Sequence, residues 1–111
     1  MNTIPLFPLS SVLFLKGRMP LQIFEQRYIE LVSQCMKTDT GFGIVWLQQG
    51  SEVTRLGQKE MRFGEYGTYA RIVDWDLLPN GLLGIKIEGQ EVFKIFETQL
   101  QDSKLVTAEV D

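Results

Sequence analysis

The residues best suited to chemistry are two aspartates, Asp74 and Asp76, which stand on either side of Trp75. Side chains two positions apart in a strand point to the same side of the sheet, so these carboxylates would share one face. Such a pair could bind a divalent cation or supply a general acid and base. The pair also precedes Pro79-Asn80-Gly81, which predicts a hairpin turn, and acidic residues are common at exposed strand ends. We therefore expect solvated carboxylates here and no metal site.

The residue types present support neither nucleophilic catalysis nor catalysis with a cofactor. The chain has no histidine and one cysteine, Cys35. The missing histidine excludes a Ser-His-Asp triad, a Cys-His pair and an HExxH zinc helix within this chain. The one Gly-x-Gly sequence, Gly41-Phe42-Gly43, precedes an apolar run and does not open a helix, so no phosphate loop is indicated. We predict a non-catalytic chain without cofactors.

Composition and charge restrict the partners further. The chain has 111 residues, 44% hydrophobic and 23% charged, which suits one globular domain. A net charge of −3 argues against nucleic acid as a partner, because neutralising phosphates favours basic proteins. The N-terminus does not resemble a signal peptide, and no apolar run approaches the roughly 18 residues that span a bilayer. With Cys35 expected to be a buried thiol, we predict a cytoplasmic protein without membrane contact.

The elements that must position these residues are one helix and several strands. Apolar residues recur at helical spacing over residues 25–37, which predicts one amphipathic helix. Alternating or β-branched runs predict about six strands, at residues 4–9, 20–24, 42–47, 67–78, 83–95 and 106–111. Residues 48–66 are polar and read as a long surface loop or hairpin. Gly89 interrupts the strand at residues 83–95 and predicts a bulge or bend there. Long strands with such a central glycine favour a coiled sheet, so the predicted class is mainly β (α+β), a barrel-like sheet with one main helix.

The start of the predicted helix is the most distinctive stretch. A strand runs directly into the helix, and Phe24 could pack onto the first turn as a hydrophobic staple. Glu25 suits the positive end of the helix dipole, and Arg27 could pair with a nearby acid. The alternative interpretation is a recognition site, in which Phe24, Glu25, Arg27 and Tyr28 form a peptide-binding surface.

Five segments in register resemble the N-terminal substrate-binding domain of Lon proteases. They are Pro5-Leu-Phe-Pro-Leu9, the stretch from Pro20 to Tyr28, Gly41-Phe-Gly-Ile-Val45, Gly67-Thr-Tyr-Ala-Arg-Ile72 with Asp74, and Gly81-Leu-Leu-Gly-Ile85 with Gly89. The sequence is more similar to small stand-alone bacterial Lon-domain proteins than to the corresponding domain of a full protease. It departs from the family where Gln26 replaces a usual proline and Val92 a usual arginine.

The resemblance implies a PUA-like pseudo-barrel of six strands with one helix, formed by residues 1–111 and lacking the helical bundle that follows in the family. It also implies a non-catalytic module that binds unfolded or tagged polypeptide in protein quality control and could self-associate. The ATPase and the Ser-Lys protease of the family belong to downstream domains. A PUA-like RNA-binding module is the alternative. It would use aromatic residues of the barrel, but most of these have the spacing of core residues: Tyr69, Trp75, Phe93 and Phe96.

Overall fold

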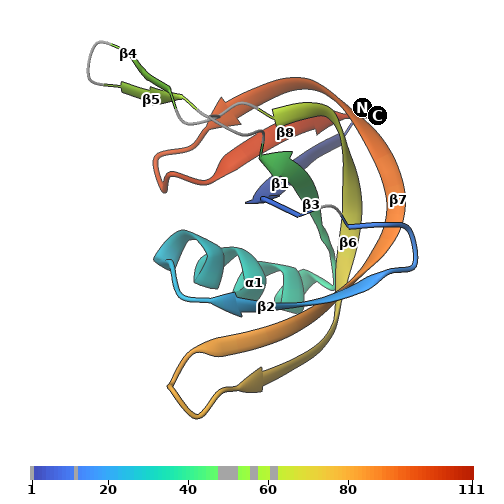
Figure 1. Ribbon diagram of the computed structural model, residues 1–111, viewed down its shortest axis with the longest axis vertical. Coiled ribbons are helices and arrows are strands. Elements are labelled where there is room, and N and C mark those ends of the chain that lie inside the picture. Colours follow the sequence, from blue (N-terminus) through green and yellow to red (C-terminus); the bar gives the residue numbers. More distant parts are fainter. Residues whose placement is uncertain (1, 12, 48–52, 56–57, 61–62) are drawn as a thin grey trace.

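The computed structural model describes residues 2–11, 13–47, 53–55, 58–60 and 63–111. This part of the chain forms one helix and eight strands, whose arrangement can be followed in Figure 1. In chain order they are β1 (Asn2–Leu9), β2 (Arg18–Ile23), α1 (Gln26–Thr38), β3 (Phe42–Leu47), β4 (Val53–Arg55), β5 (Gln58–Glu60), β6 (Phe63–Leu77), β7 (Leu83–Leu100) and β8 (Val106–Val110).

Strand β7 organises the main sheet because it pairs along both of its edges. β6 runs antiparallel to it along one edge, from Leu83 to Lys94. Along the other edge, residues 83–88 pair with β2 and residues 95–100 pair with β8. The strand order is β2-β7-β6-β3-β1-β8, and the β7–β8 pairing closes five strands into a barrel with β2 outside it. The predicted mainly β fold, with a six-stranded sheet and one helix, is confirmed.

The gap between β2 and β8 is filled by the loop that enters β2. The N–H of Lys16 donates to the Gly89 carbonyl at 2.8 Å, and the Gly89 N–H donates to the Gly17 carbonyl at 3.0 Å. A side chain at Gly89 would collide with the Phe14 carbonyl oxygen, so only glycine fits this crossing. The β6–β7 register also shifts here, which confirms the bulge predicted at Gly89.

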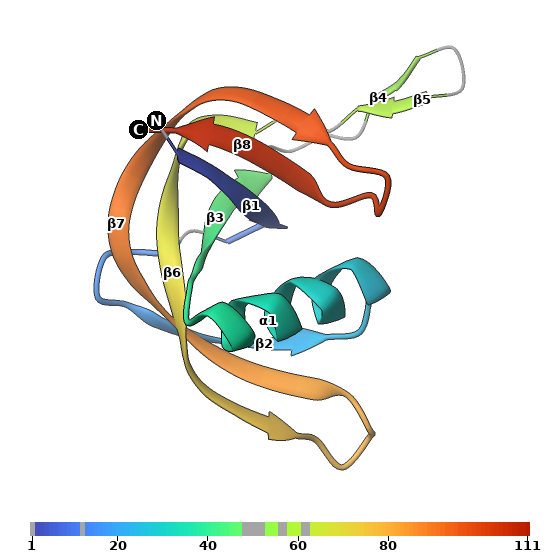
Figure 2. The ribbon, with the colours of Figure 1, turned by 180° about the vertical axis from the view of Figure 1, so that it is seen from behind.

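The helix lies beside β2 in both ribbon views, between the barrel and the β6–β7 hairpin (Figures 1 and 2). Its buried face joins a core cluster with the inner side chains of β2, β3 and β7. That cluster comprises Phe7, Leu13, Ile23, Tyr28, Leu31, Val32, Cys35, Phe42, Ile44, Ala70, Ile85 and Ile87. A second, smaller cluster fills the barrel, with Leu6, Val45, Phe93, Ala108 and Val110. The predicted amphipathic helix face is therefore found in the core, and so are Phe42, Ile44 and Val45 of β3, whereas Trp46 of the same strand is 47% exposed.

Several element boundaries differ from the prediction, among them those of β1, which begins at Asn2, and β7, which extends to Leu100. α1 spans Gln26–Thr38 because Glu25 has an extended backbone and acts as the N-cap residue. Phe24 follows the last residue of β2 and is not part of the strand. β6 begins at Phe63, before the predicted residue 67, while β4 and β5 form an antiparallel hairpin within residues 48–66, which was one of the two alternatives predicted there. Within the described residues, no helix is long and apolar enough to cross a membrane.

Candidate functional site

The helix start is built on the backbone of Glu25. Its carbonyl accepts the N–H groups of Tyr28 and Ile29, both at 3.0 Å, and so begins the helical hydrogen-bond pattern. The Glu25 side chain makes no capping bond to the backbone. It accepts a hydrogen bond from Nη2 of Arg27 at 3.0 Å instead. The prediction that Arg27 pairs with a nearby acid is thus confirmed, and that acid is Glu25.

Arg27 also joins the helix start to the turn between β7 and β8. Its Nη1 donates to the carbonyl oxygen of Lys104 at 2.9 Å, across 77 positions of the chain. The guanidinium carbon lies 4.8 Å from the centre of the Tyr28 ring, a cation–π arrangement. Only 21% of the Arg27 side chain is exposed. Arg27 therefore holds two distant parts of the fold together and offers little surface to a partner.

Tyr28 belongs to the core, and Phe24 does not. The Tyr28 ring is 7% exposed and its centre lies 4.3 Å from that of Phe7. Burial raises the pKa of the Tyr28 phenol and the Glu25 charge adds to the rise, while the Arg27 charge opposes it. Phe24 is 67% exposed, so the predicted hydrophobic staple is wrong. Of the four predicted site residues, Phe24 and Glu25 face solvent, and Arg27 and Tyr28 fix their position.

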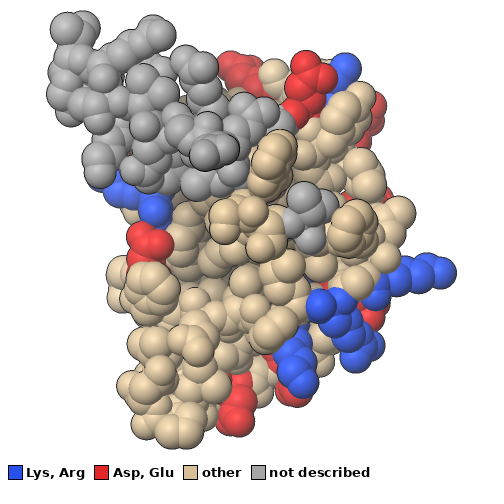
Figure 3. All heavy atoms as spheres, in the orientation of Figure 1, with Lys and Arg blue, Asp and Glu red and all other residues tan. Residues whose placement is uncertain are grey.

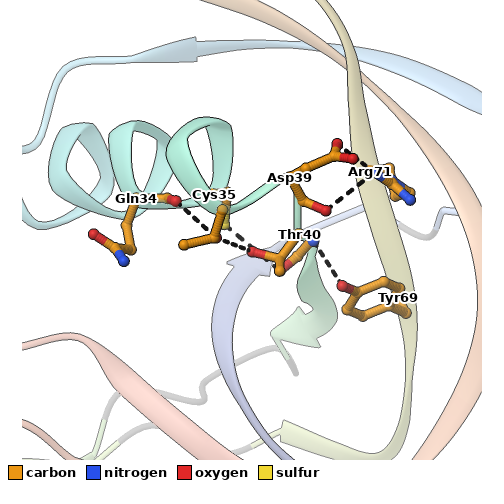
Figure 4. Close-up of polar contacts among 8 residues, drawn as sticks. Gln34, Cys35, Asp39, Thr40, Tyr69 and Arg71 are labelled. Atoms are coloured by element: carbon orange, nitrogen blue, oxygen red, sulfur yellow. Dashed lines mark hydrogen bonds and ion pairs between the residues drawn. The ribbon is translucent and has the colours of Figure 1, made fainter.

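The end of the helix is fixed just as firmly, against β6 (Figure 4). Asp39 adopts the left-handed conformation with φ 52°, which turns the chain toward β3. Arg71 donates through Nη2 to Oδ1 of Asp39 at 2.5 Å and to its carbonyl oxygen at 3.1 Å. The Gly41 N–H donates to the Tyr69 hydroxyl at 2.6 Å. The buried Cys35 thiol lies 3.5 Å from the Gly41 carbonyl, and burial raises its pKa.

The paired aspartates share a face, as predicted. Asp74 lies opposite Lys86 and Asp76 opposite Gly84, and directly opposite residues lie on one side of a sheet. Oδ1 of Asp74 accepts the backbone N–H of Trp75 at 2.9 Å. Across the described residues, no three Asp, Glu or Cys side chains come together as metal ligands. The pair contributes negative charge to the surface of the hairpin.

Sequence reasoning missed an apolar surface around Trp75. Trp75 and Phe96 were two of the four aromatic residues of the predicted barrel, most of which had the spacing of core residues, yet they are 54% and 51% exposed. Trp75 lines a shallow hollow of about 350 Å³ with side chains of α1 and β7, namely Val32, Ser33, Met36, Lys37 and Leu83. Figure 3 shows that few charged side chains lie over α1 and the hairpin on this face, while Lys and Arg gather to one side. β3 pairs with β6 only as far as Ala70, so the segment of β6 that carries Trp75 has no neighbour on that edge among the described strands.

The described residues thus form a closed barrel with one packed helix and an exposed apolar surface. The family model of the ATP-dependent protease La (LON) substrate-binding domain matches residues 3–111. The chain therefore belongs to this family of substrate-binding domains, which are non-catalytic.

Similar proteins agree with this assignment. A Lon protease of Cytophaga hutchinsonii is 29% identical over 110 residues, which are 98% of this chain and 13% of that protein. The crystal structure of a Lon N-terminal domain protein from Xanthomonas campestris superposes with a TM-score of 0.86 and 32% identity, over all of this chain and 59% of that one. The N-terminal domain of Mycobacterium avium complex Lon protease shares the fold, with a TM-score of 0.66 at 13% identity over 99% of this chain and 54% of that one.

Proposed function

We propose that this domain binds unfolded or tagged polypeptide and delivers it to protein quality control. The observation that carries the proposal is the family match over residues 3–111, since that family is defined by substrate binding. The chain spans 13% of the Lon protease it resembles and 59% of the Xanthomonas structure. The proposal therefore concerns recognition alone, and cleavage would belong to other domains.

The helix start is the proposed contact surface. Phe24 offers an exposed ring to an apolar residue of a polypeptide, and the carboxylate of its chain neighbour Glu25 is partly exposed but already paired with Arg27. Arg27 and Tyr28 would act as positioning residues, because they tie this surface to Lys104 and to Phe7. Because these two exposed groups are held in a fixed position, less conformational entropy is lost on binding.

Contacts through side chains fit this surface better than addition of a strand to β2. β2 pairs with β7 alone among the described strands, so its other edge carries backbone groups without a strand partner. Pro20 stands in the middle of that edge and has no N–H to donate. Proline on an edge strand is a common protection against pairing with other chains.

The charge distribution argues against the RNA-binding alternative. Three of the described arginines are already paired: Arg18 with Glu88, Arg27 with Glu25, and Arg71 with Asp39. Binding to RNA depends on free positive charge, and the net charge is −3. We expect no measurable affinity for structured RNA at 50 mM salt, and fluorescence anisotropy measures it.

The setting of the domain is part of the proposal. The lone cysteine, Cys35, is buried and forms no disulfide, which supports the proposed cytoplasmic location. Exposed apolar side chains would also allow weak self-association. Sedimentation velocity over a range of protein concentrations measures that association.

The proposed contact surface is tested by exchanging exposed phenylalanines. Phe24→Ala should weaken binding to a chemically unfolded protein by about tenfold, since an apolar contact is lost. Phe14→Ala is the matched control, because Phe14 is 75% exposed but lies in the loop that crosses Gly89. Equal affinities for the two variants in an NMR or fluorescence titration would contradict the role given to Phe24.

A further inference from the structure

One strand edge near the helix end has no strand partner. β3 pairs with β6 only as far as Ala70. From Arg71 to Leu77, β6 has β7 along one edge and none of the described strands along the other. Val73, Asp74, Trp75, Asp76 and Leu77 are all exposed. A row of free backbone donors and acceptors of this kind is what an added strand needs.

The two faces of this edge differ in chemistry. Trp75 lies opposite Ile85, a core residue, so its ring is on the side of the sheet that α1 covers. Asp74 and Asp76 lie on the opposite side, with Lys86 across from Asp74. A strand alternates its side chains in the same way. An added strand would therefore place every second side chain near Trp75 and the others near the two carboxylates.

There is room beside the edge for such side chains. A hollow of about 370 Å³ runs between this edge and the last turn of α1, lined by Met36, Asp39, Ile72 and Val73 among others. It shares Met36 and Trp75 with the shallow apolar hollow described above. Together they form one continuous surface along the edge.

Pairing of this edge with a second copy of itself is disfavoured, whereas pairing with a basic partner is not. It contains no proline, in contrast to β2. Two copies paired through this edge would bring Asp74 and Asp76 of each chain together, and like charges in opposite positions destabilise a pair. The same carboxylates attract lysine or arginine. The bond from the Trp75 N–H to Asp74 also satisfies one backbone donor until a ligand replaces it.

We infer that residues 71–77 of β6 dock an extended polypeptide segment in which large apolar residues alternate with lysine or arginine. The apolar side chains lie against Trp75 and Met36, and the basic ones face Asp74 and Asp76. This inference rests on the proposed function, because it names a second surface, apart from Phe24, by which the domain holds a polypeptide. It adds the extended conformation of the bound segment and the sequence pattern that would be preferred.

The test uses Trp75 as its own reporter. The chain has two tryptophans, so Trp46→Phe leaves Trp75 as the single one. The probe is a short peptide in which leucine alternates with lysine. Binding should shift the emission of the half-exposed Trp75 to shorter wavelength with saturation. Trp75→Phe, which leaves Trp46 as the reporter, should show no such shift. Phe96→Ala is the matched control for an exposed aromatic residue and should bind as the parent does.

Two further peptides separate strand addition from other modes. In one peptide the backbone nitrogens of the leucines are methylated, and in the other those of the lysines, which gives the two possible frames. An added strand turns only one set of N–H groups toward β6, so one frame should lose at least about tenfold in affinity and the other should bind normally. Replacing lysine by glutamate in the peptide, or Asp74→Asn with Asp76→Asn in the protein, should weaken binding several-fold.

The outcomes distinguish this inference from the proposed function. Equal binding of both methylated peptides, or an emission shift from Trp46 in place of Trp75, overturns docking at this edge. An unfolded protein that binds through Phe24 while the alternating peptide does not bind overturns the inference and leaves the proposed function standing. Absence of binding to any unfolded polypeptide overturns both.

Discussion

Removing the Arg27 guanidinium should destabilise the domain much more than removing an exposed arginine. The change is Arg27→Met, which keeps the apolar stem but removes the charged head. The head donates one charge-assisted hydrogen bond to the Lys104 carbonyl from a largely buried position, which contributes about 1.5–3 kcal/mol. The half-exposed ion pair with Glu25 adds about 0.2–1 kcal/mol, and the contact with the Tyr28 ring about 0.5–1 kcal/mol.

These contributions overlap, so we expect a net loss of about 2–3 kcal/mol in the free energy of unfolding. In a domain of this size that corresponds to a fall of about 10 °C in Tm. Urea denaturation followed by circular dichroism measures the first quantity, and differential scanning calorimetry the second. Arg18→Met is the control, because Arg18 is 66% exposed and its ion pair with Glu88 lies in solvent.

Equal stability losses for the two methionine variants would refute the assignment of Arg27 as a link between the helix start and the β7–β8 turn. A second outcome is equally informative. If Arg27→Met remains folded at 10 °C and keeps its full affinity for polypeptide there, Arg27 does not position the contact surface, and its role as a positioning residue is wrong.

Three other predictions concern the rest of the fold. Gly89→Ala should lower the free energy of unfolding, measured by urea denaturation, by about 1–3 kcal/mol, because the added methyl group meets the Phe14 carbonyl. Gln90→Ala, at the neighbouring exposed position, should be nearly neutral. Equal losses for the two variants would contradict the close approach at Gly89. The Cys35 thiol, buried and with a raised pKa, should resist alkylation at pH 8 until urea unfolds the chain, as intact mass measures; rapid labelling of the native protein would be inconsistent with its burial. The pKa of Tyr28 is raised in the folded state, so its contribution to stability is complete below the ordinary tyrosine value of 10.0 and is lost as pH rises through the folded value. Tyr28→Phe should therefore flatten the fall in Tm at alkaline pH. An identical alkaline profile for the variant and the parent would argue against this linkage.

Local sequence patterns predicted most of the fold. The helical spacing over residues 25–37 identified the buried face with Tyr28, Leu31, Val32 and Cys35, since burial of that face depends only on periodicity. Gly89 was recognisable because glycine in the middle of a strand often marks a bulge, a bend or the close approach of another backbone. The boundaries at Glu25 and Phe63 were less accurate, because they depend on where hydrogen bonding begins.

The candidate surfaces were harder to predict, since they depend on contacts between distant residues. The pattern placed Phe24 and Arg27 together, but it could not show that Arg27 reaches Lys104, 77 positions away. Trp75 has the spacing of a core residue, and the prediction of burial fails because β3 stops pairing at Ala70. Exposure at such a position depends on how far the neighbouring strand extends, and the sequence around Trp75 does not determine that length.

The central claim is that this domain recognises polypeptide in its unfolded state. The most direct measurement compares the affinity of the domain for one protein in two forms, native and permanently unfolded by reduction and carboxymethylation, using isothermal titration calorimetry or NMR titration. We predict saturable binding of the unfolded form and no binding of the native form at the same concentrations. Equal affinity for the two forms, or no shift with unfolded chain at millimolar concentration, would contradict the claim.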